Sequence, residues 1–258
     1  MSTLNYEIGG DGPRVALLHP VGLDLTFLAP VADILREEFT VLTLDQRGHG
    51  GSRAMTRAHS LEDYADDLHA LLCELEFAPA AIIGFSFGGM VAQALAIKYP
   101  RAVSALVICA CTATQTTESR ATAQARGNDA RRNGMADVLE ATLDRWFTAS
   151  FRAAGKDRSA RERLLSDNPE GWAAAWYAMG NVDTLPRLST ITVPTLCIAG
   201  ERDKSSPPSI VQRIADAIPG ARFAVIAGAP HMLFIEHPEE TARTIARFLR
   251  EGAPLYGR

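Results

Sequence analysis

The strongest constraint on the fold lies in residues 81–100, which read AIIGFSFGGMVAQALAIKYP. A short apolar run typical of a strand leads into the pattern Gly-x-Ser-x-Gly at residues 84–88, and an apolar-rich helical stretch follows at once. A chain that turns so sharply from strand to helix strains the backbone of the serine, and glycines at 84 and 88 avoid clashes with the flanking strand and helix. Ser86 is therefore predicted to be a nucleophile. The alternative is a glycine-rich structural turn with an incidental serine.

The rest of the chain repeats this alternation of strand and helix. Short β-rich runs occupy residues 15–19, 40–44, 80–83, 103–109, 195–199 and 222–226. Helical patterns occupy residues 27–38, 61–76, 87–99, 209–218 and 239–250. Several of the runs are almost continuously apolar, as strands buried on both faces should be. The pattern predicts an α/β fold, with a mostly parallel sheet flanked by helices on both faces.

The alternation stops between residues 113 and 183, where the sequence reads as helices without a convincing strand. We therefore predict a core domain of residues 1–112 and 184–258, with a helical cap, or lid, inserted at 113–183. All three tryptophans of the chain, Trp146, Trp172 and Trp176, lie in this insertion. Trp146 and Trp176 are candidates to line a substrate pocket beneath the cap. Alternatively, the aromatic residues form only the core of the insertion.

A serine hydroxyl is a weak nucleophile at neutral pH, so Ser86 requires a general base elsewhere in the chain. His231 lies after the last strand-like run, and loops at the carboxyl ends of parallel strands are where catalytic groups gather. His237 precedes a proline at the start of a helix, which suits a structural cap better. His59 and His69 are typical of loop and helix-surface positions, and the other candidate, His49, lies in a glycine-rich turn.

The base in turn needs a carboxylate that fixes its tautomer and stabilises the imidazolium. The segment AGERDKSSPP follows the strand-like run at 195–199 and offers Asp203. Glu201 is the competing acid, but it directly follows Gly200 at the strand end and would need a different loop path to reach the histidine. The predicted catalytic residues are thus Ser86, Asp203 and His231, in that order along the chain.

Composition narrows the class of partner. The formal net charge of -4 over 258 residues leaves no basic excess for a nucleic acid or a polybasic membrane patch, and no run of about 18 apolar residues suggests a membrane span. A soluble cytoplasmic protein with a small-molecule partner is expected.

The four cysteines show neither a C-x-x-C pair nor zinc-ligand spacing, so we predict reduced core cysteines and no metal site. The proposed chemistry requires no cofactor. Monomer and homo-oligomer both remain open.

Together, the serine turn, the residue order and the interrupted alternation resemble the α/β-hydrolase superfamily over essentially the whole chain. The resemblance implies the α/β-hydrolase fold, with an eight-stranded sheet and a helical cap insertion. LLHPVGLD at residues 17–24 is similar to the family's oxyanion loop, with Pro20 in place of the commoner glycine. By this resemblance the backbone N–H groups of Val21 and Phe87 form the oxyanion hole. Pro230 also stands where glycine is frequent.

The cap sequence RGNDARRNGMADVLEATLDRWFTASFR, with DNPEGWAAAW downstream, is similar to the lid of 3-oxoadipate enol-lactonases. Those enzymes hydrolyse a lactone with a free carboxylate, so the resemblance implies that lid arginines such as Arg126, Arg131 or Arg132 bind it. Residues 113–183 hold ten Lys/Arg and ten Asp/Glu, so these arginines could equally pair with neighbouring acids.

The leading functional hypothesis is hydrolysis of a carboxylic ester or lactone through an acyl-enzyme intermediate on Ser86. A carbon–carbon bond hydrolase acting on a vinylogous diketone and a cofactor-free perhydrolase, or haloperoxidase, would use the same three residues. A small-molecule receptor on a hydrolase scaffold is the non-enzymatic alternative, because fold and motif alone do not establish chemistry. Haloalkane dehalogenases and epoxide hydrolases are disfavoured because they usually carry aspartate where Ser86 stands. The physiological substrate is not specified by the sequence.

Overall fold

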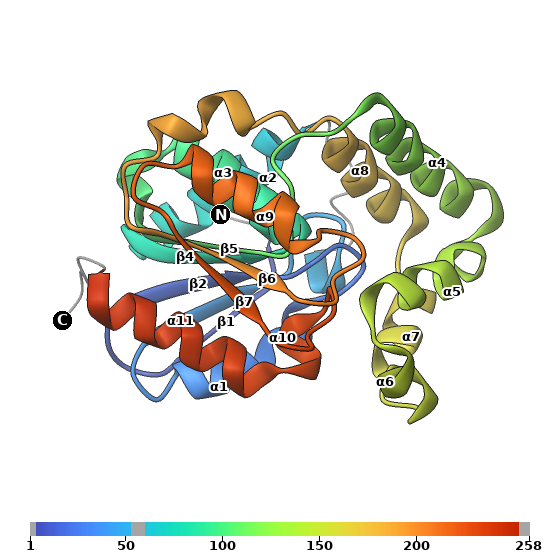
Figure 1. The fold of residues 1–258 in the computed structure, drawn as a ribbon, viewed down its shortest axis with the longest axis horizontal. Coiled ribbons are helices and arrows are strands. Elements are labelled where there is room, and N and C mark those ends of the chain that lie inside the picture. Colours follow the sequence, from blue (N-terminus) through green and yellow to red (C-terminus); the bar gives the residue numbers. More distant parts are fainter. Residues whose placement is uncertain (1–3, 53–59, 253–258) are drawn as a thin grey trace.

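The computed structural model describes residues 4–52 and 60–252 of the chain, and a mostly parallel sheet lies at its centre (Figure 1). Within these residues the sheet has seven strands in the order β1-β3-β2-β4-β5-β6-β7. The strands are β1 (Tyr6–Gly9), β2 (Arg14–Leu18), β3 (Thr40–Leu44), β4 (Ala80–Phe85), β5 (Val103–Cys109), β6 (Thr195–Gly200) and β7 (Arg222–Ile226). Neighbouring strands pair in parallel, except that β1 pairs antiparallel with β3 at the edge.

All six strand-like runs of the sequence are strands of this sheet, but the strand count differs from the eight that the family resemblance implies. Ten described residues precede β2, and they form only the short edge strand β1. That strand carries no continuous apolar run, and its Tyr6 and Ile8 side chains are exposed. An edge strand needs no apolar residues on both faces, so the continuous apolar run that marks the central strands is absent from β1.

Helices cover both faces of the sheet. Figure 1 shows α1 and α11 on one face and α2, α3 and α9 on the other. The helices of the core are α1 (Ala29–Leu35), α2 (Leu61–Glu74), α3 (Phe87–Lys98), α9 (Pro208–Ala217), α10 (Leu233–Glu236) and α11 (Pro238–Gly252). Short 3-10 turns lie at Leu25–Leu28, Gly50–Ser52, Pro100–Ala102 and Leu185–Thr190. In α11, Ile245 and Leu249 are fully buried in the core while Glu239 and Arg243 stay in solvent, which is the pattern of an amphipathic surface helix.

The chain between β5 and β6 is helical, and we call residues 113–183 the cap segment. Its helices are α4 (Thr117–Asn133), α5 (Met135–Trp146), α6 (Ala149–Ala153), α7 (Arg158–Leu165) and α8 (Pro169–Gly180). They lie together beside one end of the sheet (Figure 1). Helices α4 and α8 approach closely at two glycines. A Cβ on Gly127 would lie 2.6 Å from the Tyr177 ring, and a Cβ on Gly180 would lie 3.2 Å from Ala123 Cβ.

Both ends of the cap segment are tied to each other and to the core. Thr114 and Asp183 form an antiparallel bridge, and the amide of Thr184 donates to the carbonyl of Ala113 over 2.9 Å. The buried hydroxyl of Thr184 also donates to Gln93 Oε1 on α3, at 2.6 Å. The cap segment therefore leaves and re-enters the core through one narrow, hydrogen-bonded neck. In the described part of the chain, no helix combines the length and apolar character that a membrane span requires.

Candidate active site

Ser86 occupies a strained turn between β4 and α3. Its backbone has φ 53° and ψ -113°, a left-handed conformation that is unusual for a residue other than glycine. The flanking glycines are needed because the chain is crowded there. A Cβ on Gly84 would lie 2.2 Å from the carbonyl oxygen of Gly88, and a Cβ on Gly88 would lie 2.5 Å from that of Leu18. The turn thus has the geometry that the Gly-x-Ser-x-Gly pattern predicts.

The structure brings the three predicted catalytic residues into one hydrogen-bonded chain. His231 Nε2 lies 2.8 Å from Ser86 Oγ, and His231 Nδ1 lies 2.8 Å from Asp203 Oδ2. The second oxygen of Asp203 accepts the amides of Ser205 and Ser206, at 2.7 and 2.9 Å. With its proton on Nδ1 facing the carboxylate, the His231 ring presents a lone pair on Nε2 to the serine hydroxyl. The arrangement can carry a proton from Ser86 to His231.

The competing residues point elsewhere. Glu201 accepts the amide of Gly228 at 2.7 Å, so its carboxylate is engaged in the neighbouring loop and does not approach His231. His237 caps the C-terminus of α10, and the ring of His69 stacks on Tyr99 at the surface. His59 lies outside the described residues.

A buried histidine fixes the loop that follows β2. His19 Nδ1 donates to the carbonyl of Pro20 at 2.7 Å, and His19 Nε2 accepts the amide of Gln46 at 2.9 Å. Because the Pro20–Val21 peptide is trans, its N–H points away from the carbonyl that His19 holds. Among the described residues the Val21 N–H has no acceptor, and Val21 lines the same cavity as Ser86. The amide of Phe87 is also without an intrahelical partner, because Phe87 is the first residue of α3. Two donors are thus available near the serine.

His19 should make the stability of the fold depend on pH. Burial, together with the nearby His49, lowers the pKa of His19 to about 3, whereas an unfolded histidine titrates near 6.5. Between these values the unfolded chain binds more protons than the folded one, so His19 contributes stability that falls as the pH is lowered. We expect the free energy of unfolding in urea to decrease from pH 6.5 to 4.5, by at most about 1.4 kcal/mol per pH unit from this group. A His19→Asn variant should have a flatter profile and His69→Asn should not; an unchanged slope in His19→Asn would contradict this assignment.

The cavity over Ser86 has a volume of about 690 Å³, and both apolar and polar side chains line it. Its walls include Trp146 and Trp176, the two tryptophans that the sequence offered as candidates, together with a run of hydroxyl and amide side chains that begins just before the cap segment and continues into its first helix. These polar wall residues are Thr112, Thr114, Gln115, Thr116, Ser119 and Thr122. Trp172 is fully buried and does not line the cavity.

Cationic side chains outnumber acidic ones around this cavity. Among the described lining residues Arg126, Arg145, Lys204 and Arg213 are cationic, and Glu118 is acidic. The chain as a whole carries a net charge of -4, so the cavity departs from the charge of the rest of the molecule.

Arg126 and Arg145 are half-buried, and neither forms an ion pair within the described residues. Arg126 stacks over the Trp176 ring at 4.6 Å. Burial lowers the pKa of Arg126, and burial together with the charge of Arg126 lowers that of Arg145 to about 10. Two partly desolvated cations facing one cavity are suited to bind an anionic group.

Two of the lid arginines suggested by the sequence lie outside this cavity. Arg131 pairs with Glu170 on the exposed surface of the cap segment, at 3.0 Å, and Arg132 is exposed on α4. Arg145 takes the place beside Arg126 instead. Nothing in the sequence distinguishes Arg145 from the other basic residues of the cap segment, because its role depends on how α4 and α5 pack.

No cluster of three or more His, Cys, Asp or Glu side chains that could hold a metal ion occurs among residues 4–52 and 60–252. Cys109, Cys111 and Cys197 are buried free thiols whose pKa values burial raises, as expected of core cysteines. Cys73 differs from the prediction because it is exposed on α2.

The fold and the site define a class: a mostly parallel α/β sheet whose strand ends carry a serine, a histidine and an aspartate in hydrogen-bonded contact. A family model described as "Alpha/beta hydrolase family" matches residues 15–244, and the chain belongs to this family of hydrolytic enzymes. A curated relative, 3-oxoadipate enol-lactonase 2 of Acinetobacter baylyi, is 28% identical over 92% of this chain and 89% of its own length.

Solved structures agree with this placement. The enol-lactonase from Burkholderia xenovorans LB400 superposes with a TM-score of 0.90 at 31% identity, covering 96% of each chain. A thermophilic esterase from Thermogutta terrifontis, solved with malate bound, also has a TM-score of 0.90, at 32% identity, covering 96% of this chain and 93% of its own. Ester and lactone hydrolases are therefore among the relatives of this chain.

Proposed function

We propose that the chain hydrolyses a carboxylic ester or lactone and that this substrate also carries a free carboxylate group. One observation carries the proposal: the hydrogen-bonded chain of Ser86, His231 and Asp203 opens into a cavity that also presents two half-buried arginines, neither of which forms an ion pair within the described residues. The first part of this arrangement supplies a nucleophile, and the second supplies a binding site for an anion.

In the proposed reaction Ser86 Oγ attacks the substrate carbonyl while His231 Nε2 takes the serine proton. Asp203 holds the proton on Nδ1 and stabilises the imidazolium that forms. The proton then passes to the leaving oxygen, and an acyl group remains on the serine. Water, activated by His231 in the same way, attacks the acyl-enzyme and restores the free hydroxyl. No other reactant is required.

The amides of Val21 and Phe87 would stabilise the oxyanion of both tetrahedral intermediates. Such donors act because they are oriented before the reaction, and the deletion of a single donor in other hydrolases costs about 3 kcal/mol. The His19 ring supports this role, since it holds the Pro20 carbonyl and so orients the Val21 N–H.

The carboxylate part of the proposal rests on Arg126 and Arg145. A guanidinium binds a carboxylate through two parallel hydrogen bonds, and partial burial strengthens the attraction. The hydroxyl side chains along the cavity wall favour a polar substrate over one with a long fatty acyl chain. Two relatives are consistent with a carboxylate-bearing substrate. One is an enol-lactonase, and the other is an esterase solved with malate, a molecule that has two carboxylates.

The test is a kinetic comparison of matched substrates with and without a free carboxylate. Phenyl acetate is compared with the monophenyl ester of succinate, and a plain five-membered lactone with the same lactone bearing a carboxymethyl group. We expect kcat/KM to be higher by about 100-fold for the carboxylates, the effect of hydrogen bonds to a charged group. A preference for the neutral members would refute the carboxylate site. Hydrolysis of a vinylogous diketone, peroxide-dependent bromination in acetate, or binding without turnover would instead favour the alternative functions.

A further inference from the structure

Resting on the proposed hydrolase function, we infer that Arg163 on cap helix α7 is a positioning residue for the oxyanion loop, which we define as residues 20–24. The Arg163 ion pair with Asp24 couples the cap segment to the loop that carries the Val21 N–H. The cap segment would thus hold one of the oxyanion donors in place as well as cover the substrate.

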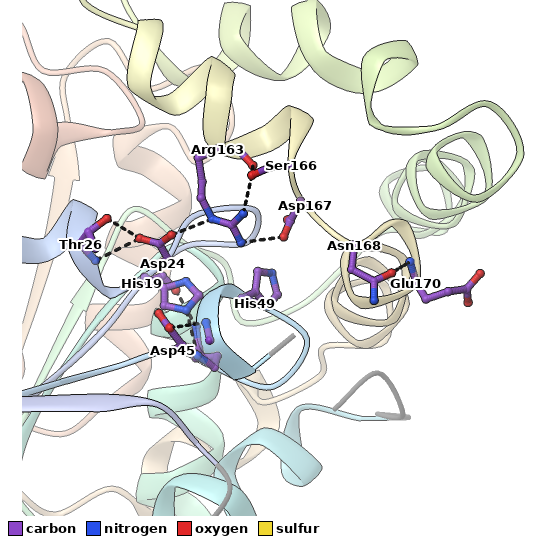
Figure 2. A network of polar contacts seen from close by, with 12 residues as sticks. His19, Asp24, Thr26, Asp45, His49, Arg163, Ser166, Asp167, Asn168 and Glu170 are labelled. Carbon is purple, nitrogen blue, oxygen red and sulfur yellow. Dashed lines mark hydrogen bonds and ion pairs between the residues drawn. The ribbon is translucent and has the colours of Figure 1, made fainter. Parts of the chain in front are cut away.

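Arg163 lies in a largely buried cluster of charges between the cap segment and the core, which Figure 2 shows from close by. Its Nε lies 2.7 Å from Asp24 Oδ2, and its Nη2 donates to Asp167 Oδ1 at 2.9 Å. Nη1 donates to the hydroxyl of Ser166 at 3.0 Å. Only 14% of the Arg163 side chain and 15% of that of Asp24 are exposed, and Asp167 is fully buried. Because the pair is largely shielded from solvent, removal of either partner leaves a charge that is poorly hydrated, which costs more than the loss of a surface salt bridge.

Both ends of the oxyanion loop are fixed by side chains. At the start, His19 holds the carbonyl of Pro20, as described above. At the end, Asp24 Oδ1 accepts the amide of Thr26 at 3.0 Å and so caps the 3-10 turn at Leu25–Leu28. Arg163 takes the other oxygen of Asp24. The contact with the cap segment therefore lies three residues from the Val21 N–H.

The middle of the oxyanion loop also packs directly against the cap segment. Gly22 has φ +74°, and a Cβ there would lie 2.5 Å from the Trp172 ring and 2.7 Å from Leu164 Cδ2. Leu164 follows Arg163 on α7, and Trp172 lies on α8. Helices α7 and α8 thus form the wall against which the oxyanion loop packs.

Loss of the Arg163 charge would leave Asp24 as a partly buried carboxylate without its cation. Such a group moves toward water or takes up a proton, and either change releases the end of the loop. An oxyanion donor must lie about 2.7–3.1 Å from the developing charge, so a small shift of Val21 weakens binding of the transition state. The ground state of a small neutral ester does not need that contact. A positioning role therefore predicts a lower kcat at an unchanged KM.

The test uses Arg163→Met and Asp24→Asn, with p-nitrophenyl acetate as a substrate that has no carboxylate. The matched control is Arg158→Met, which removes an arginine of the same helix whose ion pair with Glu162 is exposed. We expect kcat to fall about tenfold or more in both test variants, with KM within twofold of wild type, and no change in the control. The double variant should be no worse than the single ones, and Arg163→Lys should recover part of the loss.

A second readout does not depend on activity. Hydrogen exchange of a peptide spanning residues 17–28 should be at least about fivefold faster in Arg163→Met than in wild type or Arg158→Met. If Arg163→Met does not fold, Arg163→Lys and Asp24→Asn carry both measurements. A lower melting temperature with unchanged kcat or unchanged loop exchange would overturn the inference, leaving the proposed function intact. A wild type that hydrolyses neither an ester nor a lactone, but whose loop exchange still responds to Arg163, would instead refute the proposed function alone.

Discussion

Replacement of Ser86 by alanine is expected to lower kcat/KM for p-nitrophenyl acetate by about 10⁴-fold or more. The serine hydroxyl is the only proposed nucleophile, and the oxyanion donors and substrate binding that remain give only weak residual catalysis in other serine hydrolases. The comparison is made by steady-state kinetics on highly purified protein, with pre-steady-state measurement of the nitrophenol burst in wild type.

A matched control is Ser104→Ala, which makes the same change at a buried serine on β5. It should retain near wild-type turnover, and both variants should have melting temperatures close to that of wild type. Retention of a tenth or more of the activity in Ser86→Ala would show that the reaction does not pass through this serine.

Replacement of Arg145 by glutamine is expected to lower kcat/KM for the carboxylate-bearing substrates by about 10- to 100-fold, the range of a hydrogen bond to a charged group. Arg126→Gln should act in the same direction, because both guanidinium groups lie half-buried at one cavity without an acidic partner. The matched neutral ester or lactone should be hydrolysed at an unchanged rate. The measurement is the ratio of kcat/KM for the two members of each substrate pair.

Arg132→Gln serves as the control, since Arg132 is exposed on α4 and does not line the cavity. An equal loss on neutral and carboxylate substrates in Arg145→Gln would indicate a distorted cap segment and not a lost anion contact.

The sequence was most informative where function depends on a local pattern. The turn at Ser86 needs glycines within two residues of the serine, so its geometry could be predicted from five consecutive positions. His231 and Asp203 could be proposed as the base and the acid because both follow strands, and the carboxyl ends of parallel strands lie at one edge of the sheet. Their hydrogen-bonded contact itself is visible only in the structure.

Contacts across the cap segment could not be predicted in this way. Arg131 and Arg145 lie on neighbouring helices, and only the packing of α4 against α5 and α8 decides which one reaches the cavity. Arg163 and Asp24 are 139 positions apart. The edge strand β1 was missed for a different reason: it is only four residues long, and its alternation of Tyr6 and Ile8 with Glu7 and Gly9 lacks the continuous apolar run of the central strands.

The neck described above has an evolutionary consequence. Because Ala113 and Thr184 are hydrogen-bonded neighbours, the cap segment could be exchanged for a longer or shorter one without opening the sheet, and substrate range could diversify by such replacement. The pairing of Arg163 with Asp24 would limit this freedom. A chimaera that receives the cap segment of another hydrolase would keep an ordered oxyanion loop only if the new segment also supplied a cation facing Asp24. Cap and loop would then evolve as a matched pair.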